Sequence, residues 1–367
     1  MHIAYIISED VSVASGVLKK VEAKIRYWKK YGHKVSLISL KSTSMTALVD
    51  DAIILSQYVK EKNFRKKFLR RITISVKLDQ CLYNLQPDVI YTRYTAMPDL
   101  VHIFKKHAPY IVEINTNDVT ELKNGKVSRY IFNLLTRSYF LSNAEGFVSV
   151  SKELMLNKVF IKFKKKFIVI GNGYDFNSVS NWKSSFHDKL KFIFIGSPKQ
   201  PWHGTDKIII LAKKLRKYEF HIVGPTKKDF NLNENFENNI IFHGYRDSNY
   251  LKKLIPECDI GISSLALHRN DMEEASPLKS REYLAYGLPI IIGYDDTDLP
   301  VDFEYLLNIG NYEDNVKDHF DQIERFANKF KNINPMEIRK NSEKYIDYQT
   351  KEKLRLNFIQ QIINKEY

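Results

Sequence analysis

A polar loop that leads into an expected helix contains residues suited to binding a diphosphate. Pro277 stands where the first turn of a helix tolerates proline. Backbone N–H groups from Ser276 through Leu278 to Lys279, together with the positive end of the helix, favour an anion. Lys279 would add a point charge. This stretch therefore predicts a site for the two phosphates of a nucleotide sugar.

Two glutamates flank this loop and could complete such a site. Glu282, one turn into the helix, could accept hydrogen bonds from a ribose diol, and Glu274, at the end of the loop, could accept them from the hydroxyls of a second sugar. Either glutamate alone is more often an ordinary surface residue. Their spacing around Lys279 favours a nucleotide diphosphate sugar as the ligand.

Two further turns could approach phosphates. Gly196 and Gly204 enclose a loop in which Lys199 and His203 could reach an anion, although a plain proline-rich loop is the alternative. Gly16 begins a helix after the first strand, but the segment lacks the GxGxxG fingerprint of dinucleotide sites, and a simple turn between strand and helix is the alternative there.

The elements that must position these residues form two series of alternating strands and helices. The expected strands of the first series cover residues 2–7, 34–40, 88–91, 110–114, 146–150 and 167–170, and those of the second cover 191–195, 220–223, 239–243, 260–263 and 289–292. Such alternation predicts α/β domains with parallel sheets. We expect two Rossmann-like domains that face each other across a cleft, because ligands bind beyond the carboxyl ends of such strands.

Composition excludes several classes of protein. The chain has 367 residues, of which 44% are hydrophobic and 27% charged, which is typical of a globular protein. No apolar run reaches the roughly 18–20 residues of a membrane-spanning helix. We see no signal peptide at the N-terminus, and two cysteines do not predict a disulfide framework. These features indicate a protein of the reducing cytosol.

The positive charge lies in the first half of the chain. Residues 1–175 contain 29 Lys and Arg against 15 Asp and Glu, whereas the remainder contains 28 of each. A dense basic run extends from Lys60 to Arg71. Such runs attract anionic lipid headgroups or phosphates, and the alternatives are a solvated face or a nucleic-acid surface. No nucleic-acid-binding motif supports the last alternative.

Taken in order, these motifs resemble those of the retaining GT-B glycosyltransferases, the family that includes bacterial group 1 sugar transferases and phosphatidylinositol mannosyltransferases. Glu274 and Glu282 match the family's E-x7-E element. The matching segments continue with Glu282 to Pro289, Asn172 to Asp175, Val150-Ser151, Phe242 to Gly244 and Gly32 to Val35. Together they extend over residues 1–300.

The resemblance implies a domain organisation and residue roles. We expect an acceptor-side domain at 1–175, a nucleotide-sugar domain at 176–335 and C-terminal helices at 336–367 that pack back on the first domain. Donor binding is expected from Gly16, Gly196, His203, Gly204, Ser276, Leu278, Lys279 and Glu282, and catalysis from Glu274, Lys279, Lys199 and Asp118.

The chain departs from the family pattern at two places. Ser197 and His203 occupy positions where the family usually has Arg and Lys, so Lys199 is expected to replace the arginine. Many members also have His after the strand at 110–114, where this chain has Asn115, Asn117 and Asp118 on the expected acceptor side. Asp118 is the carboxylate that we expect to orient an acceptor hydroxyl.

The resemblance also implies a reaction. A sugar would move with retention from a nucleotide diphosphate sugar, UDP favoured over GDP, to a saccharide or polyprenyl-linked saccharide, as in bacterial surface polysaccharide synthesis. No DxD triplet ends a strand, so we expect no metal and no other cofactor. The expected location is the cytosolic face of the plasma membrane. The alternatives are a nucleotide-sugar 2-epimerase of the same architecture and a non-enzymatic polybasic protein of the membrane surface.

Overall fold

The computed structural model describes residues 1–13, 15–57, 64–95, 97–123, 126–179, 189–230 and 238–365. These divide into two compact units, one formed by Met1–Ile170 with Lys351–Tyr367 and the other by Gly171–Thr350. Residues 60–63 of the basic run fall outside the described part. No helix within the described ranges is long and apolar enough to cross a bilayer.

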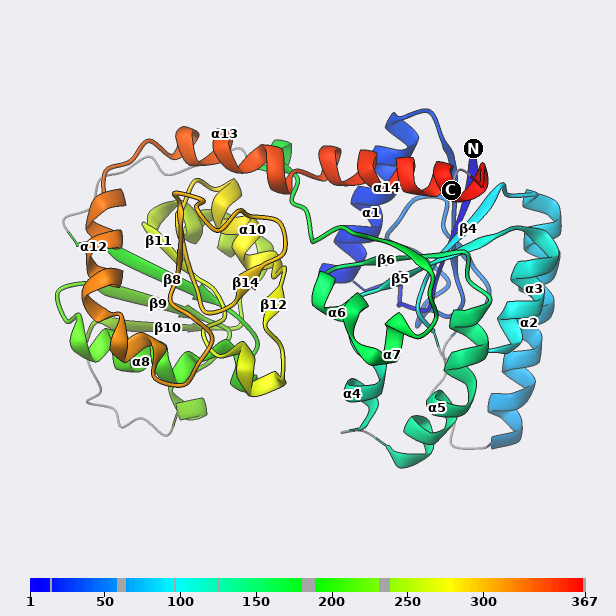
Figure 1. Ribbon diagram of the computed structural model, residues 1–367, viewed down its shortest axis with the longest axis horizontal. Coiled ribbons are helices and arrows are strands. Elements are labelled where there is room, and N and C mark those ends of the chain that lie inside the picture. Colours follow the sequence, from blue (N-terminus) through cyan, green and yellow to red (C-terminus); the bar gives the residue numbers. More distant parts are fainter. Residues whose placement is uncertain are drawn as a thin grey trace. The chain divides into compact units, whose positions relative to one another are not determined.

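The first unit is built on a seven-stranded parallel sheet in the order β3-β2-β1-β4-β5-β6-β7 (Figure 1). Its strands are β1 (His2–Ile7), β2 (Lys34–Ser39), β3 (Ile53–Ile54), β4 (Val89–Arg93), β5 (Tyr110–Ile114), β6 (Gly146–Ser149) and β7 (Lys166–Val169). Its helices are α1 (Gly16–Lys30), α2 (Phe64–Leu85), α3 (Asp99–His107), α4 (Asp118–Lys123), α5 (Val127–Ser142), α6 (Lys152–Leu156), α7 (Lys158–Ile161) and most of α14 (Tyr348–Ile363).

Side chains of alternate strand residues enter two separate cores, one on each face of this sheet. Ile3 and Tyr5 of β1 belong to a cluster shared with α1 and α14, whereas Ala4 and Ile6 belong to one shared with α2, α3 and α5. Gly146 permits the approach of α14, since a Cβ there would lie 3.1 Å from the ring of Phe358. Helix α14 therefore completes the first unit, although it is far from the unit's other elements in the sequence.

The second unit has a six-stranded parallel sheet in the order β10-β9-β8-β11-β13-β15 and a separate pair, β12 with β14. Its strands are β8 (Lys191–Ile195), β9 (Glu219–Val223), β10 (Ile240–Gly244), β11 (Ile260–Ile262), β12 (Glu274–Ala275), β13 (Ile290–Ile292), β14 (Asp295–Asp296) and β15 (Leu306–Asn308). Its α-helices are α8 (Thr205–Lys214), α9 (Ser248–Leu254), α10 (Leu278–Ala285), α11 (Asn315–Asp318), α12 (Phe320–Phe330) and α13 (Pro335–Ile346).

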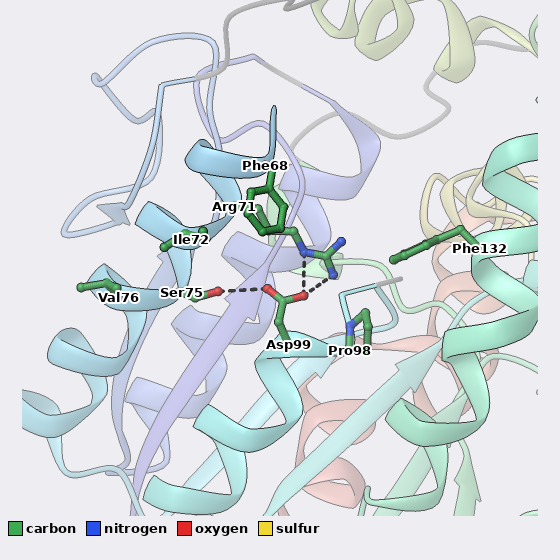
Figure 2. A pocket seen from close by; sticks show the side chains of 8 residues that line it. All are labelled: Phe68, Arg71, Ile72, Ser75, Val76, Pro98, Asp99 and Phe132. Carbon is green, nitrogen blue, oxygen red and sulfur yellow. Dashed lines mark hydrogen bonds and ion pairs between the residues drawn. The ribbon is translucent and has the colours of Figure 1, made fainter. Parts of the chain in front are cut away.

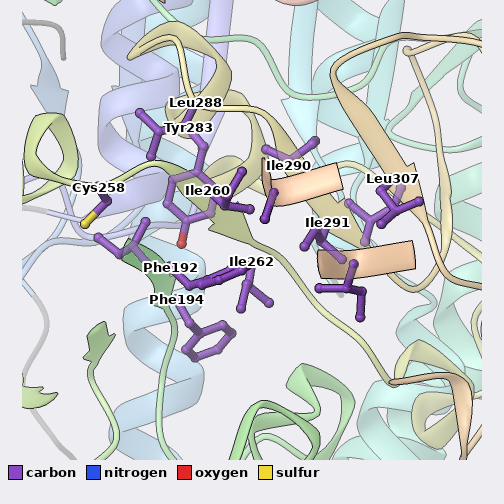
Figure 3. Packing of buried hydrophobic residues seen from close by; sticks show 14 of the residues in the cluster. Phe192, Phe194, Cys258, Ile260, Ile262, Tyr283, Leu288, Ile290, Ile291 and Leu307 are labelled. Carbon is purple, nitrogen blue, oxygen red and sulfur yellow. The ribbon is translucent and has the colours of Figure 1, made fainter. Parts of the chain in front are cut away.

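One large core holds this second sheet and its helices together. Aromatic side chains of β8, aliphatic side chains of β11 and β13, and Tyr283 of α10 pack against one another (Figure 3). Phe192 and Phe194 are fully buried, and so is Tyr283. The central strands are apolar on both faces, as expected for parallel strands covered by helices.

The boundaries between the units differ from those predicted at 175/176 and 335/336. A Cβ at Gly171 would lie 2.2 Å from the carboxylate of Asp298, so the chain already packs within the second unit there. The prediction that all of 336–367 packs on the first unit is wrong for its first part. Ile338 and Ile346 of α13 are buried in the core of the second unit, and only residues from Lys351 onward belong to the first.

Candidate active site

Helix α10 is fixed against the carboxyl ends of two neighbouring strands. The hydroxyl of Tyr283 accepts a hydrogen bond of 2.8 Å from the backbone N–H of Ile195, at the end of β8. The hydroxyl of Ser280, in the first turn, lies 2.7 Å from that of Ser263, directly after β11. The helix N-terminus, with its uncompensated N–H groups, is thereby held at the edge of the sheet where ligands bind.

The turn after β8 depends on two glycines. The N–H of Gly196 donates to the carbonyl of Val223 at 3.0 Å, and a Cβ on Gly196 would lie 2.6 Å from the ring of Phe194 and 2.8 Å from that of His203. A Cβ on Gly224, the residue after β9, would lie 1.8 Å from the carbonyl oxygen of Gly196. The backbone here is therefore packed as closely as glycine allows.

The other predicted glycine of this loop has a conformational role. Gly204 has φ of +64° and precedes α8, and Leu265 donates its N–H to the carbonyl of His203 at 3.1 Å. A left-handed backbone at this point favours glycine. Gly204 thus brings the 3₁₀ turn Pro201–His203 back against the loop after β11.

Lys279 presents a buried ammonium group beside this turn. Its Nζ lies 4.2 Å from the centre of the Phe194 ring, and it has no hydrogen-bond partner among the described residues. Burial lowers the pKa of Lys279 to about 7. A buried donor without a partner is costly, at roughly 1–3 kcal/mol, so its presence points to a ligand that supplies the acceptor.

His203 has one ring nitrogen without a partner at the same place. Its buried Nδ1 has no hydrogen-bond partner in the described part of the chain, and neither has Oε1 of Gln200. Burial and then the charge of Lys279 lower the pKa of His203 to about 3. At neutral pH the imidazole is therefore uncharged in the protein without a ligand, and it can offer hydrogen bonds to an anion.

Lys199 lies at the exposed tip of the loop. Its backbone is left-handed, with φ of +58°. Hydrogen bonds from Thr226 lower the pKa of Asp229, and the charge of Lys199 contributes to the same effect. Lys199 is thus a cation exposed to solvent, whereas the ammonium group of Lys279 is buried.

Both predicted glutamates are half-buried. Oε1 of Glu282 accepts a hydrogen bond of 3.0 Å from the hydroxyl of Tyr174, whose own pKa is raised by burial and by Glu282. Glu274 lies in β12, where it is paired in register with Asp295 of β14. Tyr174 thus orients the carboxylate of Glu282 on α10. This helix begins at Leu278, two residues after Ser276.

Ser276 is engaged in a buried network that the sequence did not reveal. The guanidinium of Arg281 donates to the hydroxyl of Ser276 at 2.8 Å, to Asp298 at 2.7 Å and to Asp296. The N–H of Asn172 donates to the same hydroxyl at 2.7 Å. The side chain of Ser276 therefore connects Asn172, at the start of the second unit, to the loop before α10. The sequence feature that could have indicated this network is the acidic segment 295–298, which follows Arg281.

Comparison with known proteins agrees with this geometry. Residues 189–297 match the family model described as glycosyl transferases group 1. This segment forms a group 1 glycosyl transferase domain. It contains the Gly196 turn, Lys279 and both glutamates, so the resemblance to the group 1 family is confirmed, and with it the expectation of a glycosyltransferase.

Solved structures of the same fold extend over the whole chain. Sucrose-phosphate synthase from Thermosynechococcus elongatus has a TM-score of 0.71 at 13% identity, with 100% of both chains covered. A lipopolysaccharide outer core galactosyltransferase has 0.65 at 15%, again with 100% of both chains covered. A protein from Anabaena, solved in complex with UDP and glucose, has 0.65 at 12%, with 98% of this chain and 100% of that chain covered. These likenesses confirm the GT-B fold. No match was found among curated proteins.

In the other unit of this glycosyltransferase, the predicted acceptor-side residues have structural contacts. Arg137 holds the carboxylate of Asp118 with two hydrogen bonds, at 2.8 and 2.9 Å, and Asn133 donates a third at 2.6 Å. Asn117 accepts from the N–H of Val119 at 3.1 Å, at the start of α4. Because Asp118 is buried in an ion pair, we no longer assign it to the acceptor.

Glu113, at the end of β5, is a carboxylate that sequence reasoning missed. Its Oε2 accepts from Lys24 of α1 and, at 2.9 Å, from the hydroxyl of Tyr91, and its Oε1 accepts from Asn115 at 3.0 Å. The charge of Lys24 acts most strongly against the effect of burial and holds the pKa of Glu113 well below its usual range. A glutamate inside an apolar strand was the signal for this buried charge.

Two further features complete the description of the expected sites. Gly16 is exposed at the first position of α1, where the side chain of Ser15 accepts from the N–H of Leu18 at 3.1 Å. Within the described ranges, no three His, Cys, Asp or Glu side chains gather into a group that could hold a metal ion.

Proposed function

We propose that this protein transfers a sugar, with retention at the anomeric carbon, from a nucleotide diphosphate sugar to a saccharide or lipid-linked saccharide. The observation that carries the proposal is the buried Nζ of Lys279 without a partner, beside the Gly196 turn and the N-terminus of α10. A diphosphate supplies the missing acceptors and meets the positive end of the helix.

The surrounding residues suit the remaining parts of such a donor. Glu282, oriented by Tyr174, would accept hydrogen bonds from the ribose, and Glu274 would bind the donor sugar on its reacting face. Lys199 would approach from the exposed rim. The neutral imidazole of His203 would hydrogen-bond a phosphate oxygen without adding charge.

In the reaction, the bond between the anomeric carbon and the diphosphate breaks, and a bond to the acceptor oxygen forms. The nucleotide diphosphate leaves with the electron pair of the broken bond, and its departing phosphate oxygen takes up the proton that the acceptor hydroxyl loses. Negative charge therefore grows on the diphosphate in the transition state, where Lys279 and the N–H groups of α10 stabilise it. This arrangement requires no metal. We favour UDP as the nucleotide, and the neighbour from Anabaena was solved with UDP and glucose.

The basic first half suggests where the acceptor is found. Residues 1–175 contain the entire positive excess of the chain, and Arg65 and Lys66 of α2 are exposed. We propose contact with the anionic cytosolic face of a plasma membrane, where lipid-linked saccharides for a bacterial surface polysaccharide would be elongated.

Calorimetric titration with UDP, GDP, ADP, CMP and uridine tests the donor site. A charge-assisted hydrogen bond contributes roughly 1.5–3 kcal/mol, so Lys279→Met should weaken the preferred diphosphate about 10- to 150-fold. Uridine lacks the phosphates and serves as the control, because its affinity should be equal in both proteins. A protein that binds none of these nucleotides at millimolar concentration, or a variant that loses uridine and UDP equally, would refute the assignment.

A further inference from the structure

The sheet of the first unit has a topological switch point between β1 and β4. The strand that follows β1 in the sequence, β2, lies on one side of β1, and β4 lies on its other side. Open parallel sheets bind ligands beyond the carboxyl ends of the strands at such a point. The residues that follow β1 and end β4 therefore stand where this unit would bind a ligand.

Glu9 and Arg93 form an ion pair across this switch point. Glu9 is the second residue after β1, and Arg93 is the last residue of β4. Oε1 of Glu9 lies 2.9 Å from Nη1 of Arg93, and the two side chains are 28% and 18% exposed. The pair is thus accessible in part, and a ligand can reach it from solvent.

Each member of this pair has one polar atom without a partner. Oε2 of Glu9 accepts no hydrogen bond and Nε of Arg93 donates none among the described residues, and both atoms are buried. Buried polar atoms are nearly always hydrogen-bonded, because an unmade bond is costly. The two atoms therefore point to a ligand that offers one donor and one acceptor.

The carboxylate next to Arg93 cannot meet this need. Glu113 of β5 is paired in register with Arg93. Its two oxygens accept hydrogen bonds from Lys24, Tyr91 and Asn115. Glu113 is thus fully satisfied by the protein, and it leaves Nε of Arg93 to an external acceptor.

A second ion pair in the same unit differs in this respect (Figure 2). Arg71 donates from Nε to Oδ1 of Asp99 at 2.6 Å, and the hydroxyl of Ser75 donates to Oδ2 at 2.9 Å. This pair lines a pocket of about 720 Å³ between α2, the start of α3 and α5. The guanidinium Nε and both carboxylate oxygens have partners there, whereas the equivalent atoms of Arg93 and Glu9 do not.

The unsatisfied atoms at the switch point define the chemistry of the ligand. A phosphate would supply acceptors but would bring negative charge against Glu9. An ammonium group would supply donors but would bring positive charge against Arg93. A hydroxyl group is uncharged, and it both donates and accepts. One hydroxyl can therefore accept from Arg93 and donate to Glu9.

We propose that Glu9 and Arg93 bind a hydroxyl group of a saccharide at the switch point of the first unit. The inference rests on the proposed function in one respect: under that function the saccharide is the acceptor. Asn115, which the sequence placed on the acceptor side, follows β5 at the same edge of the sheet. The pair would then replace Asp118, whose carboxylate is held by Arg137, as the group that binds the acceptor.

Methyl glycosides of glucose, galactose, mannose and N-acetylglucosamine test the proposal. Their binding to the full chain is measured by saturation-transfer NMR, with and without UDP, and each is compared with its monodeoxy analogues. We expect at least one glycoside to bind, and the loss of one of its hydroxyls to weaken it about tenfold or more, because hydrogen bonds to two charged groups are lost. Glycerol, a polyol without a sugar ring, should bind more weakly than this glycoside.

Variants of the pair identify the residues that bind this hydroxyl. Arg93→Met removes the donor, and Glu9→Gln removes the charge of the acceptor with little change of shape. In both variants the glycoside and its deoxy analogue should bind with nearly equal affinity. Lys106→Met is the control: it breaks an ion pair of 2.8 Å with Asp79 near the start of β5, at the opposite edge of the sheet, and should preserve the tenfold difference. Glu9→Gln decides the question if Arg93→Met does not fold.

Several results would overturn the proposal. They are the absence of binding by every glycoside at millimolar concentration, deoxy analogues that all bind as tightly as the parent, and a deoxy effect that Glu9→Gln leaves unchanged. Equal binding of glycerol would overturn the assignment to a saccharide. Inorganic phosphate that displaces the glycoside from the unaltered protein, but does not bind to Arg93→Met, would show an anion site instead.

Titration of UDP in the same samples distinguishes this proposal from the proposed function. If UDP binds and no glycoside does, the hydroxyl site is refuted and the donor site stands. If a glycoside binds in the expected manner and UDP does not bind, the hydroxyl site stands and the transferase assignment fails.

Discussion

The ammonium group of Lys279 lies 4.2 Å from the centre of the Phe194 ring, and it has no hydrogen-bond acceptor among the described residues. A ring face stabilises a cation only modestly, so burial is incompletely compensated and the amine is held near its titration point. A phosphate placed there would pair with the charged form. The charge of this one amine should thus change when a phosphate binds beside it.

Diphosphate binding should accordingly depend on pH. The pKa of Lys279 is lowered by burial to about 7 in the free protein, and a bound diphosphate raises it, because an opposite charge favours the ammonium form. The affinity is fully present below pH 7 and falls as the pH rises through 7, by up to about tenfold per pH unit.

Calorimetry of UDP from pH 7 to 9, in two buffers with different ionisation enthalpies, measures this effect as proton uptake. Lys279→Met is the control and should remove the uptake. An affinity that stays constant across this range would contradict the role given to the amine.

Glu282 and Tyr174 should act on the nucleoside and not on the phosphates. Glu282→Ala is expected to weaken uridine and UDP by the same factor, whereas Lys279→Met weakens UDP alone. Tyr174→Phe removes a hydrogen bond of 3.0 Å that orients the carboxylate, and we expect a smaller loss, about fivefold for roughly 1 kcal/mol. Titration of both ligands against each variant tests this. Loss of UDP binding alone in Glu282→Ala would place the carboxylate elsewhere.

The close backbone contact between Gly196 and Gly224 should be sensitive to one methyl group. A Cβ on Gly224 would lie 1.8 Å from the carbonyl oxygen of Gly196, so Gly224→Ala should lower the free energy of unfolding by more than the roughly 1–2 kcal/mol of left-handed strain. Gly244 also has positive φ, but its nearest neighbour is 3.9 Å away, so Gly244→Ala should cost only the strain. Urea unfolding that gives equal losses for both variants would disprove the steric argument.

Asp118 should matter for stability and not for the donor site. Asp118→Asn leaves the buried Arg137 without its counter-charge, which typically costs about 3–5 kcal/mol. UDP affinity of the folded protein should be unchanged. Glu121→Gln, on the exposed side of the same helix, is the matched control and should cost little. A stable Asp118→Asn protein that has lost only transfer activity would restore the acceptor role.

Membrane binding should depend on the basic residues at the start of α2. Arg65→Ala with Lys66→Ala removes two exposed charges at roughly 1 kcal/mol each, which corresponds to about a 30-fold weaker affinity for anionic vesicles. Lys213→Ala with Lys214→Ala in the second unit is the control. Vesicle sedimentation at two salt concentrations measures both pairs. Equal binding by the two double variants would refute a membrane contact through α2.

Much of the sheet architecture could be predicted from periodicity. The strands expected at 2–7, 110–114 and 191–195 coincide with β1, β5 and β8, because short apolar runs between turns are a strong signal for buried parallel strands. The segment that forms α2 was not predicted as a helix from the sequence, because only the basic run at its start was identified. Its buried stripe of Ile74, Leu78 and Leu82 lies among exposed apolar side chains, which obscures the helical period.

The candidate site was predictable where one segment contains it and not where distant segments meet. Lys279 and Glu282 stand on one helix, so their spacing alone indicated a common ligand. Asp118 looked equally available, because its partner Arg137 lies nineteen residues later and pairs with it only in the folded unit. The low pKa of His203 is likewise a result of packing against Phe194 and Lys279, which no spacing reveals.

The place of α14 in the first core has a consequence for how the chain is made. Leu356, Phe358, Ile359 and Ile362 are buried beside α1, yet the ribosome synthesises them after the entire second unit. During translation the second unit can fold as soon as it emerges, while the first still exposes the face that α14 will cover. The synthesis of the first unit thus begins before that of the second unit, but its folding is completed later. Its apolar face stays uncovered until α14 has left the ribosome.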